Sequence, residues 1–387
     1  MRTALAWKNL TGEWRRLLTG TAGVCFAAVL MFMQNGFRNA LLDSPVQLVE
    51  AVRGDLVATS VIRYAMTAEQ RFPRDLLSRA GSDPDVAWVA PVMIERASAR
   101  IRVEDQPRRS IRVIAAPLEE HLFDDAEIRR QLPALRPLGN ALVDRQSKRQ
   151  YGFARRDPER LAAQRIELLD RRVRVVGTFE IGTDFANDGN LLLSPESLAH
   201  YFPFRGNGDP LSVVDFGLIR LRPGADPEVV AARLSALAPQ QWRVVPRSEI
   251  VAREIAFWDA QTPIGMIFFI GTVMGFAVGV IICYQILYTN IHDSLPELAT
   301  LKAMGYANGF FMGVVVRQSI YLSVLGFVPA LLVSWGLFQL LQELAGLPML
   351  MTPERVAVVF LLTLAMCVVS GLLALRKLVR ADPANLF

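Results

Sequence analysis

Residues 294–306 read S-L-P-E-L-A-T-L-K-A-M-G-Y and lie between two long apolar runs. Ser294 and Glu297 have the spacing of a capping box, in which both side chains accept hydrogen bonds from backbone N–H groups at the start of a helix. Gly305 can adopt the left-handed conformation that ends many helices. The stretch therefore predicts a capped helix about 15 Å long, at ~1.5 Å per residue, between two segments of membrane-spanning length.

Four apolar runs are long enough to cross a bilayer, which takes roughly 20 helical residues for ~30 Å of hydrocarbon. The first run is longer than the apolar part of a signal peptide, about 7–15 residues, and no small-residue cleavage motif follows it. We therefore expect it to be retained. The predicted transmembrane helices cover residues 17–37, 261–289, 310–342 and 356–375.

Lys and Arg gather at the two ends of the chain, in residues 1–16 and in the tail 376–387. Loops rich in Lys and Arg face the cytoplasm, so both termini are predicted to be cytoplasmic in a multi-pass protein of the inner membrane. Residues 38–260 then form a periplasmic domain, and the short loop 343–355 is also periplasmic. Residues 290–309, which contain the helix quoted above, are cytoplasmic.

The composition of the chain excludes several classes of protein. A hydrophobic content of 52% and a mean hydropathy of +0.29 are too high for an ordinary soluble enzyme. Residues 38–260 hold 32 Lys and Arg against 31 Asp and Glu, so the pI near 9.3 reflects membrane-flanking residues and predicts no binding to nucleic acid. The three cysteines, Cys25, Cys283 and Cys367, fall within predicted spans and the histidines are scattered, so no metal site is predicted.

The predicted periplasmic domain has a strand-helix-strand pattern at each end, which is typical of a split ferredoxin-like domain. Its two parts are residues 54–104 and 211–246, and about 105–210 would be an inserted β-rich subdomain. The predicted fold class is an α-helical membrane protein with four transmembrane helices and a large α+β periplasmic domain. The expected strands and helices of the ferredoxin-like parts cover residues 55–60, 74–80, 86–94, 213–221, 227–237 and 242–245.

A glycine face is predicted on the second span. Gly271, Gly275 and Gly279 recur every four residues, which places them on one side of a helix where another helix backbone can approach closely. The partner could be the first span of the same chain or a helix of a second copy.

An amphipathic pattern precedes the first span. Trp7, Leu10 and Trp14 recur at helical spacing, which predicts an interfacial helix over residues 1–16 whose tryptophans lie among the lipid headgroups. Continuation of the first span into the cytoplasm would fit the same pattern.

Sequence motifs for catalysis or nucleotide binding are absent from the chain. There is no G-x-x-x-x-G-K-[ST] loop for phosphates, no G-x-S-x-G and no H-E-x-x-H. The predicted spans contain no Asp, Glu or Lys, which a proton-coupled pump would use as its relay. We therefore expect no catalytic residue and no cofactor in this chain, and a separate subunit must supply the energy.

The helix quoted above resembles a family signature. E-L-A-T-L-K-A-M-G-Y at 297–306 is similar to the E-x-x-x-L-[KR]-A-x-G motif of FtsX/MacB-type ABC permeases, and most of all to their DevC branch. Leu295-Pro296 departs from the broader family, which has E-R/K there, but is shared with the DevC branch. Further similar segments are L-A-W-K-N-L (5–10), V-L-M-F-M-Q-N-G-F-R-N-A-L (29–41), R-L-R-P-G-A-D-P-E (220–228) and R-A-D-P-A-N-L-F (380–387).

The resemblance implies a homodimeric permease whose coupling helix, in residues 290–309, docks on an ABC ATPase that binds ATP and Mg²⁺. It further implies a membrane-fusion protein and a TolC-like outer-membrane channel as partners. ATPase motion would pass along the first two spans to the periplasmic domain, and substrate would not cross this chain. The residues implied in the ATPase contact are Glu297, Leu298, Leu301, Lys302, Ala303, Met304 and Gly305.

Three functions remain open on this basis. The leading hypothesis is a tripartite ABC exporter, with a glycolipid or another lipophilic molecule as its cargo. The alternatives are lipoprotein release in the manner of LolC and LolE, and an FtsX-like regulator of a periplasmic cell-wall hydrolase. The size of the predicted periplasmic domain favours export, because it exceeds what a simple activator usually carries.

Overall fold

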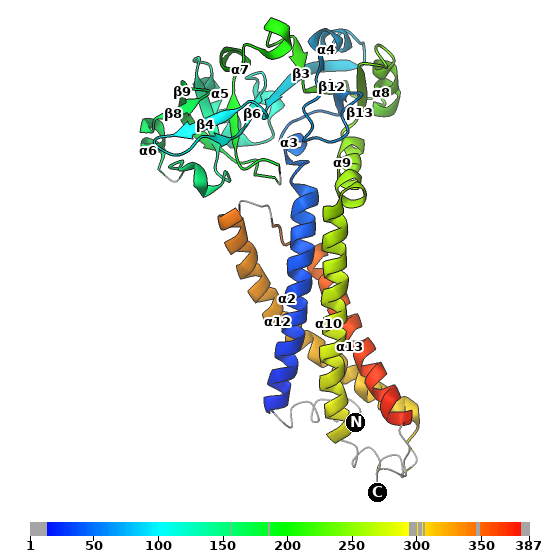
Figure 1. Ribbon diagram of the computed structural model, residues 1–387. Coiled ribbons are helices and arrows are strands. Elements are labelled where there is room, and N and C mark those ends of the chain that lie inside the picture. The colour runs from blue at the N-terminus through cyan, green and yellow to red at the C-terminus, as the bar shows by residue number, and fades with distance from the viewer. Residues whose placement is uncertain are drawn as a thin grey trace. The chain divides into compact units, whose positions relative to one another are not determined.

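The computed structural model describes residues 14–155, 157–184, 186–293, 300, 304, 306–345 and 349–380. The described residues divide into two compact units (Figure 1). We call them the membrane domain, formed by residues 14–39, 263–340 and 349–380, and the head domain, formed by residues 40–262 and 341–345.

Four long helices form the membrane domain, and each contains a stretch that is long and apolar enough to cross a bilayer. One of these helices corresponds to each of the four predicted spans, and the helices are longer than the spans. The hydropathy of the sequence indicates which residues of a helix lipid would cover. The helix itself can continue past those residues, because each added residue contributes one more backbone hydrogen bond once the helix has started. The helices are α2 (Trp14–Asp43), α10 (Pro263–Asp293), α12 (Asn308–Ala345) and α13 (Pro353–Arg380).

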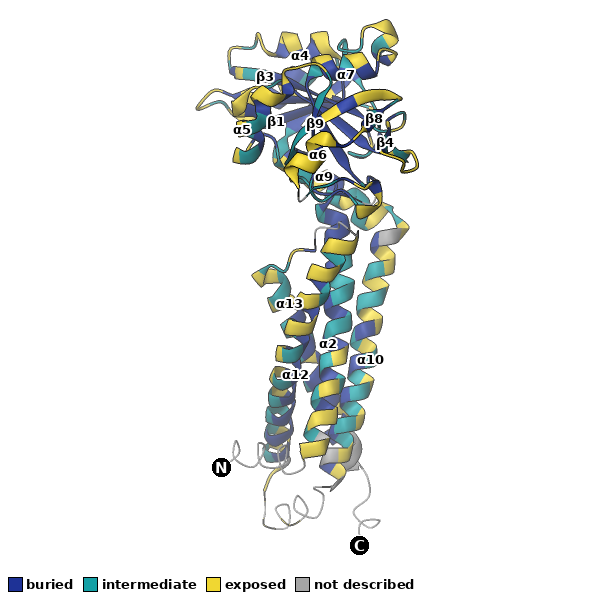
Figure 2. Cartoon of the chain, turned by 90° about the vertical axis from the view of Figure 1, so that its left-hand side faces the viewer, coloured by how far each residue is buried: buried dark blue, intermediate teal, exposed yellow. Residues whose placement is uncertain are grey.

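The membrane helices are apolar on their inner and outer sides. Val24, Cys283, Val315 and Met366 are buried together between the helices. Other large apolar side chains of the same helices are exposed, and Figure 2 shows long yellow and teal faces on them where the strands of the head are dark blue. A helix that is apolar all round is the pattern expected in lipid.

The ferredoxin-like part of the head is present as predicted. Its four strands lie in the order β13-β1-β12-β3 with antiparallel neighbours, and α4 and α8 each follow one strand and precede the next. Helix α4 has the predicted bounds. The elements are β1 (Leu56–Ser60), α4 (Arg74–Ala80), β3 (Val86–Glu95), β12 (Phe216–Leu221), α8 (Pro227–Ser235) and β13 (Trp242–Pro246).

Smaller elements surround this part. The predicted strand 213–221 is interrupted at Asp215, because its first two residues form a separate strand that pairs with β2. The helix that begins at Arg247 is followed directly by a π-helical turn, η4. These elements are α3 (Gln47–Glu50), β2 (Phe72–Pro73), β11 (Val213–Val214), α9 (Arg247–Ala256) and η4 (Phe257–Gln261).

The inserted subdomain extends the same sheet. The last residues of the long strand β3 pair with β6, and the sheet continues in the order β6-β10-β7-β9-β8-β4-β5. Strand β10 is parallel to β6, and β7 is parallel to β9, so the whole sheet is mixed. The strands are β4 (Arg100–Val103), β5 (Arg109–Ser110), β6 (Arg112–Ala115), β7 (Asn140–Asp144), β8 (Ile166–Leu168), β9 (Arg171–Phe179) and β10 (Asn190–Leu193).

The predicted limits of the inserted subdomain need correction. Strand β4 pairs with β5 and β8, so the insertion begins before residue 105 and the first ferredoxin-like part ends before residue 104. The insertion is also richer in helix than predicted, with α5 (Ala126–Leu135), α6 (Pro158–Ala163) and α7 (Pro195–Tyr201).

Side-chain caps explain where the head helices begin. Asp125, Asp157, Ser194 and Asp226 precede α5, α6, α7 and α8, and each side chain accepts a hydrogen bond from a backbone N–H of the first turn. Such caps satisfy donors that a helix cannot pair internally. In three of these helices a proline follows the cap, where its missing N–H costs nothing.

Candidate functional site

The glycine face of α10 lies against α2 of the same chain. A Cβ atom on Gly275 would be 3.6 Å from Met31 Cγ, and one on Gly279 would be 2.9 Å from Ala27 Cβ and would overlap Met366 of α13. A Cβ on Gly271 would be 2.5 Å from Gln34 Oε1. The helices therefore approach as closely as they do because these side chains are absent, while the role of the face in transport stays a prediction.

Cys283 of α10 and Cys367 of α13 are buried, and their Sγ atoms are 3.8 Å apart. A disulfide needs about 2.05 Å between the sulfurs, so the two Sγ atoms would have to approach by about 2 Å to be joined. Buried thiols in apolar surroundings are inert without a catalyst.

In a Cys25→Ser background, copper-phenanthroline oxidation is expected to join Cys283 and Cys367 within one chain. Maleimide labelling after denaturation should then count no thiol in the oxidised protein and two after reduction. The control Cys25→Ser/Cys367→Ser should keep one thiol under the same oxidation. Two free thiols after oxidation would show that α10 and α13 are not packed in this register.

Most residues predicted to contact an ATPase lie outside the described part of the chain, namely Glu297, Leu298, Leu301, Lys302, Ala303 and Gly305. Of the predicted set only Met304 is described: it is exposed, and its backbone N–H donates to Thr300 O at 3.1 Å, a spacing of one helical turn. Trp7 and Leu10 also lie outside the described residues. Trp14 is the first residue of α2, exposed and in contact with the guanidinium of Arg15.

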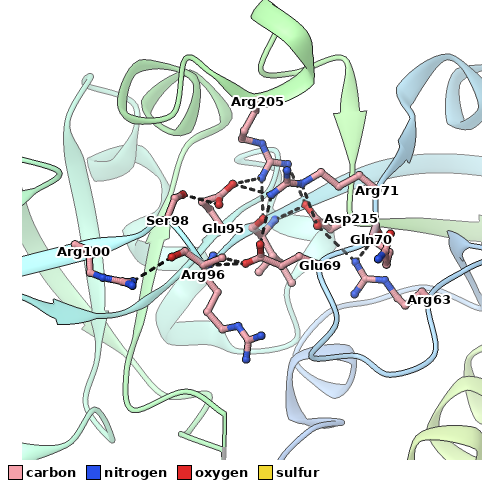
Figure 3. Close-up of polar contacts among 12 residues, drawn as sticks. Arg63, Glu69, Gln70, Arg71, Glu95, Arg96, Ser98, Arg100, Arg205 and Asp215 are labelled. Carbon is pink, nitrogen blue, oxygen red and sulfur yellow. Dashed lines mark hydrogen bonds and ion pairs between the residues drawn. The ribbon is translucent and has the colours of Figure 1, made fainter.

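A buried charge network in the head domain was not predicted (Figure 3). The Asp215 carboxylate is fully buried between β11 and β12. It accepts hydrogen bonds from the backbone N–H of Ile94 at 2.8 Å and from Arg205 Nη2 at 3.0 Å, and Arg63 Nη2 lies 3.5 Å away. One side chain thus connects β3, the insertion and the loop after β1.

Two further carboxylates complete this network. Glu95 accepts from Arg71 Nη2 at 2.7 Å and from Arg205 Nη1 at 2.9 Å. Glu69 accepts from the backbone N–H groups of Arg96 and Ala97, at 2.7 and 2.8 Å. Three guanidinium groups therefore face three carboxylates. The free energy of desolvating buried charges is about as large as the free energy gained from their attraction. The network therefore adds little to the net stability of the head domain, and its main effect is to fix one arrangement of these segments.

Arg63 shows how strongly this region is desolvated. Burial lowers the pKa of Arg63 to about 10, while the nearby charges of Asp215 and Glu254 act to raise it. Its guanidinium also stacks on the ring of Phe216, 4.1 Å from the ring centroid. Arg63 therefore remains charged at neutral pH, and its positive charge faces the carboxylate of Asp215.

The network does not form a ligand pocket. Arg63, Arg112, Asp184 and Asp215 line a cavity of about 20 Å³, which is room for little more than one water molecule. Within the described residues, no group of three or more His, Cys, Asp or Glu side chains could hold a metal ion.

A second buried polar cluster in the insertion connects Asp144 and Arg112 with Gly182, Asp184 and Asn190. Asp144 accepts from the Gly182 N–H at 2.8 Å and from Asn190 Nδ2 at 2.6 Å, and Arg112 Nη1 lies 2.7 Å from Asp184. Burial raises the pKa of Asp144, and the hydrogen bonds from Asn190 and from the backbone oppose that rise. These contacts pin a turn-rich segment onto the sheet, which is a structural role.

Comparison with known proteins adds a family assignment for part of the chain. Residues 266–383 match the family described as FtsX-like permease C-terminal. No curated protein sequence matches the chain.

Two solved structures are similar to the chain at low sequence identity. One is the periplasmic region of MacB from Actinobacillus actinomycetemcomitans, at 10% identity and a TM-score of 0.36, covering 54% of this chain and 95% of that one. The other is the extracellular domain of the noncanonic ABC-type transporter YknZ from Gram-positive bacteria, at 9% identity and a TM-score of 0.32, covering 50% and 98%.

Proposed function

The chain belongs through its residues 266–383 to the FtsX-like permeases, and on that premise we propose that it is the membrane subunit of an ATP-driven exporter. Its spans would transmit force and would not form a tunnel for the cargo. A separate ABC ATPase would bind ATP and Mg²⁺ and push on residues 290–309. The head domain would receive the movement through α2 and α10.

The packing of α10 on α2 is the observation that most supports this proposal. These two helices are continuous in the chain with the head domain, which begins just before the end of α2 and ends just before α10. The glycine face removes the side chains that would otherwise separate them. Helices in such close contact shift together, because packed interiors deform little.

We propose the following partners and orientation. Both termini and the ATPase would be cytoplasmic, and the head domain would be periplasmic. There it would meet a membrane-fusion protein and a TolC-like outer-membrane channel, with two copies of the chain forming a homodimer. A glycolipid or another lipophilic molecule would be the cargo.

The variant Leu301→Asp tests the coupling step. Leu298, Leu301 and Met304 recur every three residues and form an apolar stripe in the sequence. Burying one leucine contributes about 1.5–3 kcal/mol, so a charge at position 301 is expected to weaken ATPase binding about 10- to 150-fold. The measurement is co-purification of the partner ABC ATPase, together with complementation of a deletion strain.

Thr300→Asp is the matched control, because Thr300 is exposed and adjacent. It should retain the ATPase. Wild-type co-purification of Leu301→Asp would show that residues 290–309 are not the coupling element. Complementation by the chain and its ATPase in the absence of any fusion protein would favour the regulator of a cell-wall hydrolase over the exporter.

A further inference from the structure

Two exposed apolar side chains lie on the loop of residues 61–71, which follows β1. Ile62 is 66% exposed and Tyr64 is 69% exposed, and the Tyr64 ring lies 5.8 Å from the ring of Phe257 in η4. Trp258 packs edge-on against Phe257. We call Ile62, Tyr64, Phe257 and Trp258 the apolar tip.

The chain itself limits how far the apolar tip can be from the bilayer. Phe257 precedes Gly265, the first residue of the second candidate span, by eight residues, which span at most about 28 Å even when fully extended. On the other side, Arg63 and Met66 line one small cavity together with Pro45. Pro45 follows the end of the first candidate span by two residues, or about 7 Å at most.

The loop that carries the tip is held in place. Arg63 donates to the carbonyls of Met66 at 3.1 Å and Gln70 at 2.7 Å. The buried Glu254 of α9 accepts from the Met66 N–H at 2.8 Å and from Trp258 Nε1 at 2.7 Å. The loop is therefore already ordered in the folded protein with Ile62 and Tyr64 exposed. Binding through these two side chains would lose little further conformational entropy of the loop.

We propose that the apolar tip is a lipid-contact site, through which the head domain rests on the bilayer interface beside its two membrane connections. Tyrosine and tryptophan are enriched at the headgroup level because their rings are apolar and their edges are polar. Ile62 adds apolar area that water solvates poorly. The proposal depends only on α2 and α10 crossing the membrane, and it stands whether or not the chain is an exporter.

The test uses an environment-sensitive NBD fluorophore on single cysteines in the full chain. The native Cys25, Cys283 and Cys367 are replaced by alanine, and Tyr64→Cys, Ile62→Cys or Leu138→Cys is introduced. Leu138, on the loop between α5 and β7, is 59% exposed and serves as the matched control. Each labelled protein is reconstituted into phosphatidylcholine nanodiscs, with and without a headgroup-proximal nitroxide lipid.

We expect NBD at positions 62 and 64 to emit at shorter wavelength than NBD at position 138, and to lose intensity when the nitroxide lipid is present. NBD at position 138 should remain water-exposed and unquenched. Emission at 62 and 64 matching that at 138 would overturn the proposal. Shielding from water without quenching by lipid would also overturn it, because the tip would then be covered by protein, such as a second copy of this chain.

Discussion

Replacing Asp215 with alanine is expected to destabilise the head domain by about 3–5 kcal/mol, the usual cost of removing one partner from a buried ion pair. The variant deletes the acceptor for Ile94 N–H and Arg205 Nη2. It also leaves the buried Arg63 without the carboxylate it faces, and leaves Arg205 with Glu95 as its one remaining partner in the network. Hydrogen exchange of peptides covering β3 and β12, measured in the full chain, would report the loss of stability in the head domain.

Two comparisons make this result specific. Asp75 forms an exposed i,i+4 pair with Arg79, and Asp75→Ala should change the stability by less than about 1 kcal/mol. In Asp215→Leu/Arg205→Met one positive and one negative charge are removed together, so it should be less destabilised than Asp215→Ala. Equal losses of stability in Asp215→Ala and Asp75→Ala would show that the head domain does not depend on the buried network.

The second large effect is expected for Gly275→Leu. A Cβ there would already lie 3.6 Å from Met31 Cγ and 3.8 Å from Leu30 Cβ, so the branched end of leucine would force α10 away from α2. Overpacking of this kind costs about 1–3 kcal/mol. We expect the variant to insert into the membrane at normal levels but to fail to complement a deletion strain.

Three other glycine variants calibrate that result. Gly275→Ala should complement, because its single added carbon would be in ordinary contact. Gly279→Ala should not, because its Cβ would lie 2.9 Å from Ala27 and would overlap Met366. Gly336→Leu in α12 should also complement, since no atom lies within 4 Å of the position its Cβ would take. Full complementation by Gly275→Leu would refute a functional role for the glycine face.

Elements with local signals were predictable from the sequence, and long-range pairings were not. Helix α4 and strand β1 follow from apolar periodicity and turn residues alone. The division of β3 between two partners, β12 and β6, depends on residues more than 100 positions apart in the case of β12. No local pattern records that choice, and this is why the start of the insertion was placed too late.

The glycine face could be predicted because its three residues recur on one helix. The charge network could not, because Arg63, Glu95, Arg205 and Asp215 are spread over some 150 positions and each resembles an ordinary surface residue. One signal did exist. Asp215 interrupts the apolar stretch V-V-D-F-G-L-I at 213–219, and a carboxylate inside a buried strand requires charged or hydrogen-bonding partners.

The strand order of the head determines how long strand β1 stays unpaired while the chain is being synthesised. Strand β1 pairs with β12 on one side and with β13 on the other, and 156 positions separate Ser60, at its end, from Phe216, where β12 begins. At about 5–20 residues per second, a ribosome needs about 8–30 s to cover that distance. During this interval the strand L-V-A-T-S has two unpaired edges and five side chains that are buried only later. A nascent chain released anywhere inside the insertion is therefore left with an open strand, and β1 gains both of its neighbours only when residue 246 has been made.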